Sequence, residues 1–188
     1  MSIGPAAILL LLLLSLTSCP LLSEDTRIHH ERTAGDQAFA RNDLDGAERH
    51  YKVALDLSRR NGNENSNFIL AAGDLARLYS AQKREPEAEE LFRQRIPIAD
   101  KVWAQDAKMR SSVYYDLALF YLSRHRYTEG KPVYDQLMPL REQAFGQNSA
   151  EVADTLELFA QLFRANDHPD EATSMGSQAK AIRRLLKQ

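Results

Sequence analysis

The residues of this chain that could do chemistry are few, and only one stands out by its position. Cys19 is the single cysteine among 188 residues, and it closely follows an apolar run from Ile3 to Leu16. The five histidines are scattered along the chain, whereas a metal site needs ligands that converge. The sequence contains no glycine-rich phosphate loop, no nucleophile elbow and no His-Glu-x-x-His motif. We therefore expect no enzymatic activity, no metal site and no cofactor.

The apolar run before Cys19 is typical of a secretory signal peptide. It has six consecutive leucines from Leu9 to Leu14, and it is too short to cross a bilayer comfortably. No Lys or Arg precedes the run, which departs from the usual pattern of such signals. An exported chain with one cysteine has no internal disulfide, so its stability must come from helix packing.

The segment Leu16-Thr17-Ser18-Cys19 resembles a bacterial lipobox. In that family the signal is cut directly before the cysteine, which then receives acyl chains that anchor the protein in a membrane. The resemblance implies a signal peptide over residues 1–18, a lipidated Cys19 and a tether over residues 19–27. Pro20, in place of the aspartate associated with inner-membrane retention, favours the outer membrane, facing the periplasm. The alternative is an ordinary signal peptide and a soluble secreted or periplasmic protein.

The rest of the chain repeats itself at a spacing of 42 residues. Three copies of an apolar-Ala pair with an aromatic residue three positions after the alanine are Leu75-Ala76 with Tyr79, Leu117-Ala118 with Tyr121, and Phe159-Ala160 with Phe163. A small residue follows each alanine by 12 positions, at Ala88, Gly130 and Ala172. A looser first copy begins at Ala34-Gly35. Such self-similarity indicates a stack of identical supersecondary units.

Each unit is predicted to be a pair of helices. Val113, Tyr114, Leu117, Ala118 and Tyr121 share one broad helical face, and no stretch of the chain alternates with the period of a strand. Short polar turns separate the two predicted helices of each unit, at residues 41–43, 83–85, 124–126 and 166–168. The small residues would let the two helices approach closely, and the aromatic residues would fill the space between units.

This arrangement resembles the tetratricopeptide repeat, a helix-turn-helix family with a small residue in each helix and aromatic residues between them. The period exceeds the usual 34 residues of that family and is similar to the longer variant found in kinesin light chains. The resemblance implies an all-α, right-handed solenoid of about four repeats over residues 28–188. It also implies a non-catalytic adaptor that binds a protein or peptide partner, here in the cell envelope.

The family's pattern places a partner on the exposed face of the first helix of each repeat. The aligned positions are Arg32, Asp36, Phe39, Leu70, Arg77, Tyr115, Leu119, Leu122, Glu157, Gln161 and Arg164. The alternative is that Leu119 and Leu122 cover the core and that the arginines are merely solvated. Kinesin-light-chain repeats hold a peptide backbone with asparagines on this face, but here Gly73-Asp74, Tyr115-Asp116 and Glu157-Leu158 occupy those places.

Composition narrows the class of partner. The formal net charge is -2, and the sequence pI is near 6.2. A binding surface for nucleic acid normally carries a strong excess of Lys and Arg. We therefore expect protein partners, and a membrane contact through an acylated Cys19, but no nucleic acid.

Overall fold

The computed structural model describes residues 23–60, 62 and 64–188, and this part of the chain is helical without any strand. Cys19 and the expected signal peptide lie outside the described residues. The helices are α2 (Glu24–Ala40), α3 (Leu44–Arg60), α4 (Ser66–Ala81), α5 (Glu85–Val102), α6 (Ala107–Leu122), α7 (Tyr127–Phe145), α8 (Ala150–Ala165) and α9 (Pro169–Leu185). The all-α class expected from the repeat is confirmed.

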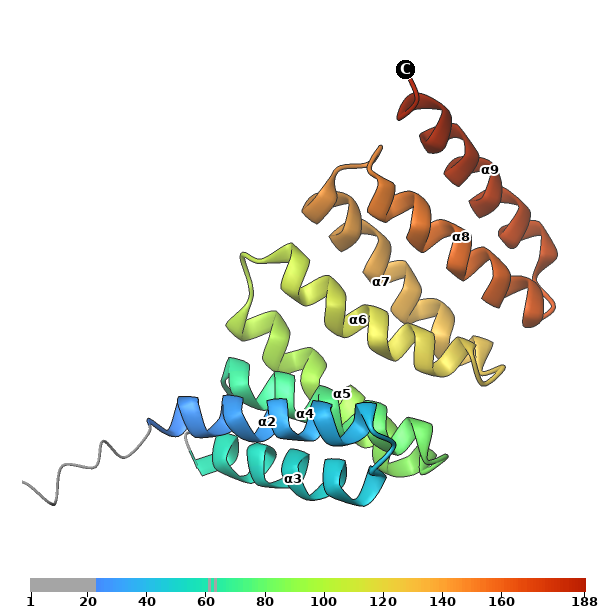
Figure 1. The fold of residues 1–188 in the computed structure, drawn as a ribbon. Coiled ribbons are helices and arrows are strands. Elements are labelled where there is room, and N and C mark those ends of the chain that lie inside the picture. The colour runs from blue at the N-terminus through green and yellow to red at the C-terminus, as the bar shows by residue number, and fades with distance from the viewer. Residues whose placement is uncertain (1–22, 61, 63) are drawn as a thin grey trace, which may run out of the picture.

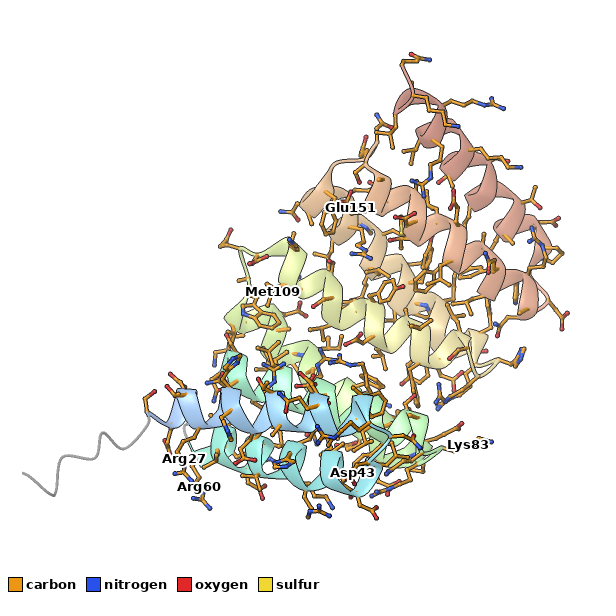
Figure 2. All side chains as sticks on the ribbon, in the orientation of Figure 1. Arg27, Asp43, Arg60, Lys83, Met109 and Glu151 are labelled. Atoms are coloured by element: carbon orange, nitrogen blue, oxygen red, sulfur yellow. The ribbon has the colours of Figure 1, made fainter. Side chains whose placement is uncertain are left out.

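The helices form four antiparallel pairs that stack in sequence order. Figure 1 shows the stack running from α2 and α3 at one end to α8 and α9 at the other. Met109 and Glu151, which are 42 residues apart, lie in the first turns of α6 and α8 and mark the repeat in space (Figure 2). The architecture is therefore the expected solenoid of helix-turn-helix repeats. We call the first helices of the pairs (α2, α4, α6 and α8) the A helices, and the second helices the B helices.

The first helix starts earlier than the sequence suggests. The hydroxyl of Ser23 accepts a hydrogen bond from the backbone N–H of Thr26 at 3.2 Å, which caps the start of α2 at Glu24. Residues 24–27 of the expected tether are thus helical. The segment between Cys19 and the folded repeats is only a few residues long.

Every pair is closed by the same tight turn. One residue in each turn has a left-handed backbone, namely Asn42, Lys83, His125 and Asp167, with φ between 58° and 64°. The next N–H reaches back five residues to a carbonyl of the A helix, as from Asp43 to Ala38 and from Arg84 to Tyr79, both at 2.9 Å. This pattern is the Schellman motif, which satisfies the last carbonyls of a helix. The chain therefore reverses identically in every repeat.

The small and aromatic residues of the repeat do what the sequence predicts. Ala76 and Ala88 in the second pair, and Ala118 and Gly130 in the third, are buried where the two helices approach each other. Aromatic rings then fill the junctions between pairs: the Phe92 and Phe120 centroids lie 5.3 Å apart, and those of Tyr134 and Phe159 lie 4.9 Å apart. Such tilted ring pairs add to the hydrophobic burial at each junction.

Leu122 departs from the expected binding face. Its side chain is only 1% exposed and lies in the core, against Gly130 of the facing helix α7. A Cβ added at Gly130 would approach Cγ of Leu122 to 2.6 Å, closer than two carbons can come. The core has room for Leu122 only because residue 130 has no side chain. The alternative reading, in which this leucine covers the core, is therefore the correct one.

Gly130→Ala is predicted to destabilise the chain although alanine favours helix formation. The added methyl group must displace Leu122, and overpacking of this kind costs about 1 to 3 kcal/mol. Gly176→Ala, in the middle of α9, is the matched control, because nothing lies within 4 Å of a Cβ at that position. We expect the control to be neutral or to stabilise the chain by up to about 1 kcal/mol. Chemical unfolding followed by circular dichroism measures both effects.

Leu122→Ala alone should cost about 2 to 5 kcal/mol, because it empties a fully buried site. In that background Gly130→Ala should cost less than it does in the wild-type chain, since the atoms that clash are gone. Equal stabilities for the two single glycine variants would show that Leu122 is not held in place by the space above Gly130.

Candidate protein-binding groove

The A-helix face is the surface formed by α2, α4, α6 and α8, which neighbour one another along the stack. Most residues predicted to bind a partner are on it and reach solvent. Arg77, Glu157 and Arg164 are exposed, Phe39 is 41% exposed, and Arg32, Tyr115 and Leu119 are half-buried. Leu122, which is buried, is the exception.

A buried carboxylate lies at the centre of this face and joins the first two repeats. Asp74 of α4 is 4% exposed and accepts a 2.6 Å hydrogen bond from Nε of Arg32 on α2. It also accepts one from Arg77, one turn further along α4. Burial raises the pKa of Asp74, while the hydrogen bond from Arg32 and the charges of Arg32 and Arg77 oppose that shift. Arg32 and Arg77, two of the three arginines expected to meet a partner, are therefore already engaged within the chain.

A second carboxylate extends this network into the third repeat. Asp116 of α6 accepts a 2.6 Å hydrogen bond from Arg95 of α5 and one of 3.3 Å from Arg77. Arg95 is 3% exposed, and its Nε has no hydrogen-bond partner among the described residues. Burial lowers the pKa of Arg95, and the charge of Asp116 opposes that shift. Removing Asp116 would leave a buried cation without its counter-charge, which is strongly unfavourable.

Arg95 reaches this position because residue 73 is a glycine. A Cβ added at Gly73 would lie 2.6 Å from Cζ of Arg95, so the guanidinium rests directly on the backbone of α4. The positions that carry backbone-holding asparagines in kinesin-light-chain repeats thus serve another purpose here. Gly73 makes room for Arg95, while Asp74 and Asp116 pair with arginines. These three residues therefore make contacts within the chain.

A hollow of about 310 Å³ lies between α4 and α6, next to this network. Arg77, Asp116 and Leu119 line it together with aromatic and polar side chains of neighbouring residues, namely Phe92, Phe120, Ser80, Ser123 and Arg124. Arg124 is fixed as part of the wall, because it donates to Glu85, Ser80, Ser123 and the carbonyl of Phe120. Apolar and aromatic side chains thus line the hollow together with polar and charged ones, a combination found in protein interfaces.

The remaining predicted residues fall into two groups. Glu157 is paired at 3.3 Å with Arg183 of α9, and Asp36 accepts a 2.7 Å hydrogen bond from Tyr51, so both have partners within the chain. Gln161 and Arg164 of α8 are exposed, and Leu70 is half-buried. Phe39 and Arg164, toward the two ends of the A-helix face, are thus exposed and have no side-chain hydrogen bond or salt bridge among the described residues.

Sequence reasoning missed the arginines that enter this face from the B helices. Arg95 of α5 and Arg141 of α7 reach toward successive A helices, and nothing in the repeat pattern distinguishes them from solvated surface residues. The spacing of Asp74 and Asp116, which is 42 residues, is a signal that could have been used. Two acids in the same register of adjacent repeats must lie near each other.

The described residues hold no cluster of three or more His, Cys, Asp or Glu that could bind a metal ion. No helix in the part of the chain that the structure describes is long and apolar enough to span a membrane.

Comparison with known proteins agrees with the fold. Two family models described as tetratricopeptide repeat match residues 69–96 and 109–184. No curated protein sequence matches the chain. BtubC (BKLC) of P. vanneervenii has a similar structure, with a TM-score of 0.79 and 16% identity over 97% of this chain and 74% of that one.

A putative kinesin light chain of Podosopora anserina with nearly identical TPR-like repeats is also similar. Its TM-score is 0.75 at 19% identity, over 96% of this chain and 87% of that one. A variant of the same protein gives a TM-score of 0.76 at the same identity, over 96% and 86% of the two chains. At these identities the likeness concerns the fold alone. Together with the stacked helix pairs and their 42-residue period, the matches show that this chain is built of tetratricopeptide repeats, arranged as in kinesin-light-chain-like proteins.

Proposed function

We propose that the chain is a non-catalytic adaptor that binds a partner protein on its A-helix face. The observation that carries the proposal is the stack of tetratricopeptide repeats, because solenoids of this kind offer an extended surface and typically act as scaffolds. The hollow beside Leu119 supplies apolar contact area, and Phe39 and Arg164 offer the kinds of side chain that anchor interfaces.

The way in which this face would recognise a partner follows from its charges. The acids at the centre of the face are neutralised by Arg32, Arg77 and Arg95, so they are not free to hold the backbone of an extended peptide. Recognition then depends on apolar contacts in the hollow and on exposed side chains around it. Such a surface suits a folded domain or a helix better than an extended strand.

We further propose that an acylated Cys19 anchors the chain in the bacterial outer membrane, with the repeats in the periplasm. The support is the lipobox-like segment Leu16-Thr17-Ser18-Cys19 after an apolar run. The distance from Cys19 to the start of α2 at Glu24 is about 17 Å at most when the chain is extended. The adaptor would therefore act within a short distance of the membrane surface.

Site-specific photo-cross-linking in cells tests the binding face. We expect p-benzoylphenylalanine in place of Phe39 on α2 or Gln161 on α8 to yield discrete adducts, because both side chains are exposed on A helices. The matched control is the same probe in place of Val53, which is 43% exposed on the B helix α3 against 41% for Phe39. Adducts from the Val53 position alone, or from none of the three, would contradict the proposal.

Arg77 is a poor choice for such a test. Its side chain bridges Asp74 and Asp116, so a substitution there would disturb the fold as well as any binding.

Mass spectrometry of the mature N-terminus tests the anchor. We expect a diacylglyceryl group on Cys19, and density-gradient fractionation should place the protein with outer-membrane markers. Cys19→Ala should release most of the protein from the membrane fraction, since acyl chains supply the hydrophobic anchoring energy. An unmodified mature terminus in a soluble fraction would favour instead the secreted or periplasmic form without lipid.

A further inference from the structure

One arginine near the A-helix face differs from the others in the described part of the chain. Each of the other buried or half-buried arginines has a carboxylate oxygen within 4.0 Å: Arg32, Arg84, Arg95, Arg110, Arg124, Arg126 and Arg183. Arg141 of α7 is half-buried, and it forms no salt bridge with any described residue. A cation that is partly removed from water normally has a counter-charge, because desolvating it alone is costly.

The side chain of Arg141 is held in a defined place. Its Nε donates to the hydroxyl of Thr155 on α8 at 3.1 Å, and that hydroxyl donates in turn to the backbone carbonyl of Glu151 at 2.7 Å. Its guanidinium carbon lies 5.0 Å from the ring centroid of Tyr115 and 5.3 Å from that of Phe145. Two aromatic faces and one hydroxyl therefore fix the guanidinium, while its terminal N–H groups donate no hydrogen bond within the described residues.

Arg95 at the preceding junction shows what Arg141 lacks. Arg95 rests on Gly73 of α4 and pairs with Asp116 of α6. The position 42 residues after Arg95 is residue 137, and Arg141 is one helical turn beyond it, on the same side of its helix. The residues 42 positions after Gly73 and Asp116 are Tyr115 and Leu158. The junction at Arg141 therefore has an aromatic ring in place of the glycine and a leucine in place of the carboxylate.

The acids nearest to Arg141 do not replace that carboxylate. Asp154 of α8 is paired with Arg183, and the exposed Glu151 stands in the first turn of α8 (Figure 2), where a negative charge is favourable for the helix. Neither forms a salt bridge with Arg141. Among the described residues, the only other cation beside the two rings is Lys108, whose Nζ lies 5.8 Å from the ring of Phe145.

We propose that Arg141 receives a carboxylate from the partner protein, an Asp or Glu side chain that enters between α6 and α8 beside Tyr115. The proposal rests on the proposed function and specifies its partner: a protein segment with an acidic residue at the point of contact. A guanidinium can bind a carboxylate through two parallel N–H groups, and the rings exclude water from the pair. A single unmatched positive charge fits the single charge of a carboxylate.

Selection from a random 12-residue peptide display library on the full-length chain in detergent micelles tests this proposal. We expect the peptides that the wild-type chain enriches to contain Asp or Glu at a fixed place, and their Asn or Gln analogues to bind at least about tenfold more weakly. The same peptides should bind Arg141→Gln at least about tenfold more weakly, since a charge-assisted hydrogen-bonded pair is lost. Arg141→Lys, which keeps the charge but not the paired N–H groups, should fall between the two.

The matched control is Arg93→Gln on the B helix α5, an exposed arginine whose loss should leave peptide affinity unchanged. Thermal unfolding of each variant shows whether the fold is kept. Should Arg141→Gln fail to fold, the comparison of acidic peptides with their amide analogues on the wild-type chain still decides the question.

Peptides that bind without any acidic requirement, or that bind Arg141→Gln as tightly as the wild-type chain, would overturn the role of Arg141 and leave the adaptor function standing. No enriched peptide at all would overturn the proposal that a protein segment enters beside Tyr115. The adaptor function, which also allows a folded domain as partner, would fall only if cross-linking from Phe39 and Gln161 failed as well. Enrichment only of peptides with a free terminal carboxylate, lost on amidation, would replace the side-chain carboxylate with a chain end.

Discussion

The close contact between the two helices of each pair is the constraint on which the rest of the structure depends. Ala76 and Ala88 in the second pair, and Ala118 and Gly130 in the third, are all buried between their helices. Larger side chains at these places would separate the helices and change the angle at which each pair meets the next. Because the same contact recurs every 42 residues, each junction presents its aromatic residues and its A-helix face in the same orientation.

Placing the A helices side by side also brings charged residues together, and the chain uses most of them for its own cohesion. Asp74 is tied to Arg32 of the first repeat, while Asp116 of the third repeat is tied to Arg95 of the second. A further carboxylate, Glu48, ties α3 to Arg84, the residue before α5. Burial opposes the charged form of Glu48, yet hydrogen bonds from Lys52 and Arg84 prevail and lower its pKa to about 2. These partly buried pairs fix how neighbouring repeats align, and they leave fewer charged side chains free to bind a partner.

The sequence predicts the fold well because the fold is periodic, and it predicts the site less well because the site depends on departures from the period. Small residues, aromatics and turns recur every 42 positions and can be placed by alignment alone. The family's pattern places Leu122 on the binding face together with Phe39 and Arg164. Those two residues are exposed, but Leu122 is buried, because the missing side chain of Gly130 lets it turn inward. Arg95 and Arg141 come from B helices and lie 46 residues apart, one helical turn more than the period. An alignment of the repeats therefore does not show that they are related. The lipid anchor at Cys19 stays a prediction, since it lies outside the described residues.

Helix α6 combines the periodic packing of the fold with two residues that depart from the period. Its apolar residues point in nearly all directions: Phe120 and Tyr121 belong to the core shared with the first two repeats, whereas Tyr114 and Ala118 belong to the core shared with the last two. A helix buried on most sides has little surface left for variation. The consecutive residues Tyr115 and Asp116 are part of that small surface. Asp116 completes the charge network of the preceding junction, while Tyr115 lies over the unpaired Arg141 of the next. Arg95, which the fold pairs with a carboxylate, and Arg141, which it does not, thus contact adjacent residues of α6. A partner bound at Arg141 would therefore act directly on the helix that holds Arg95.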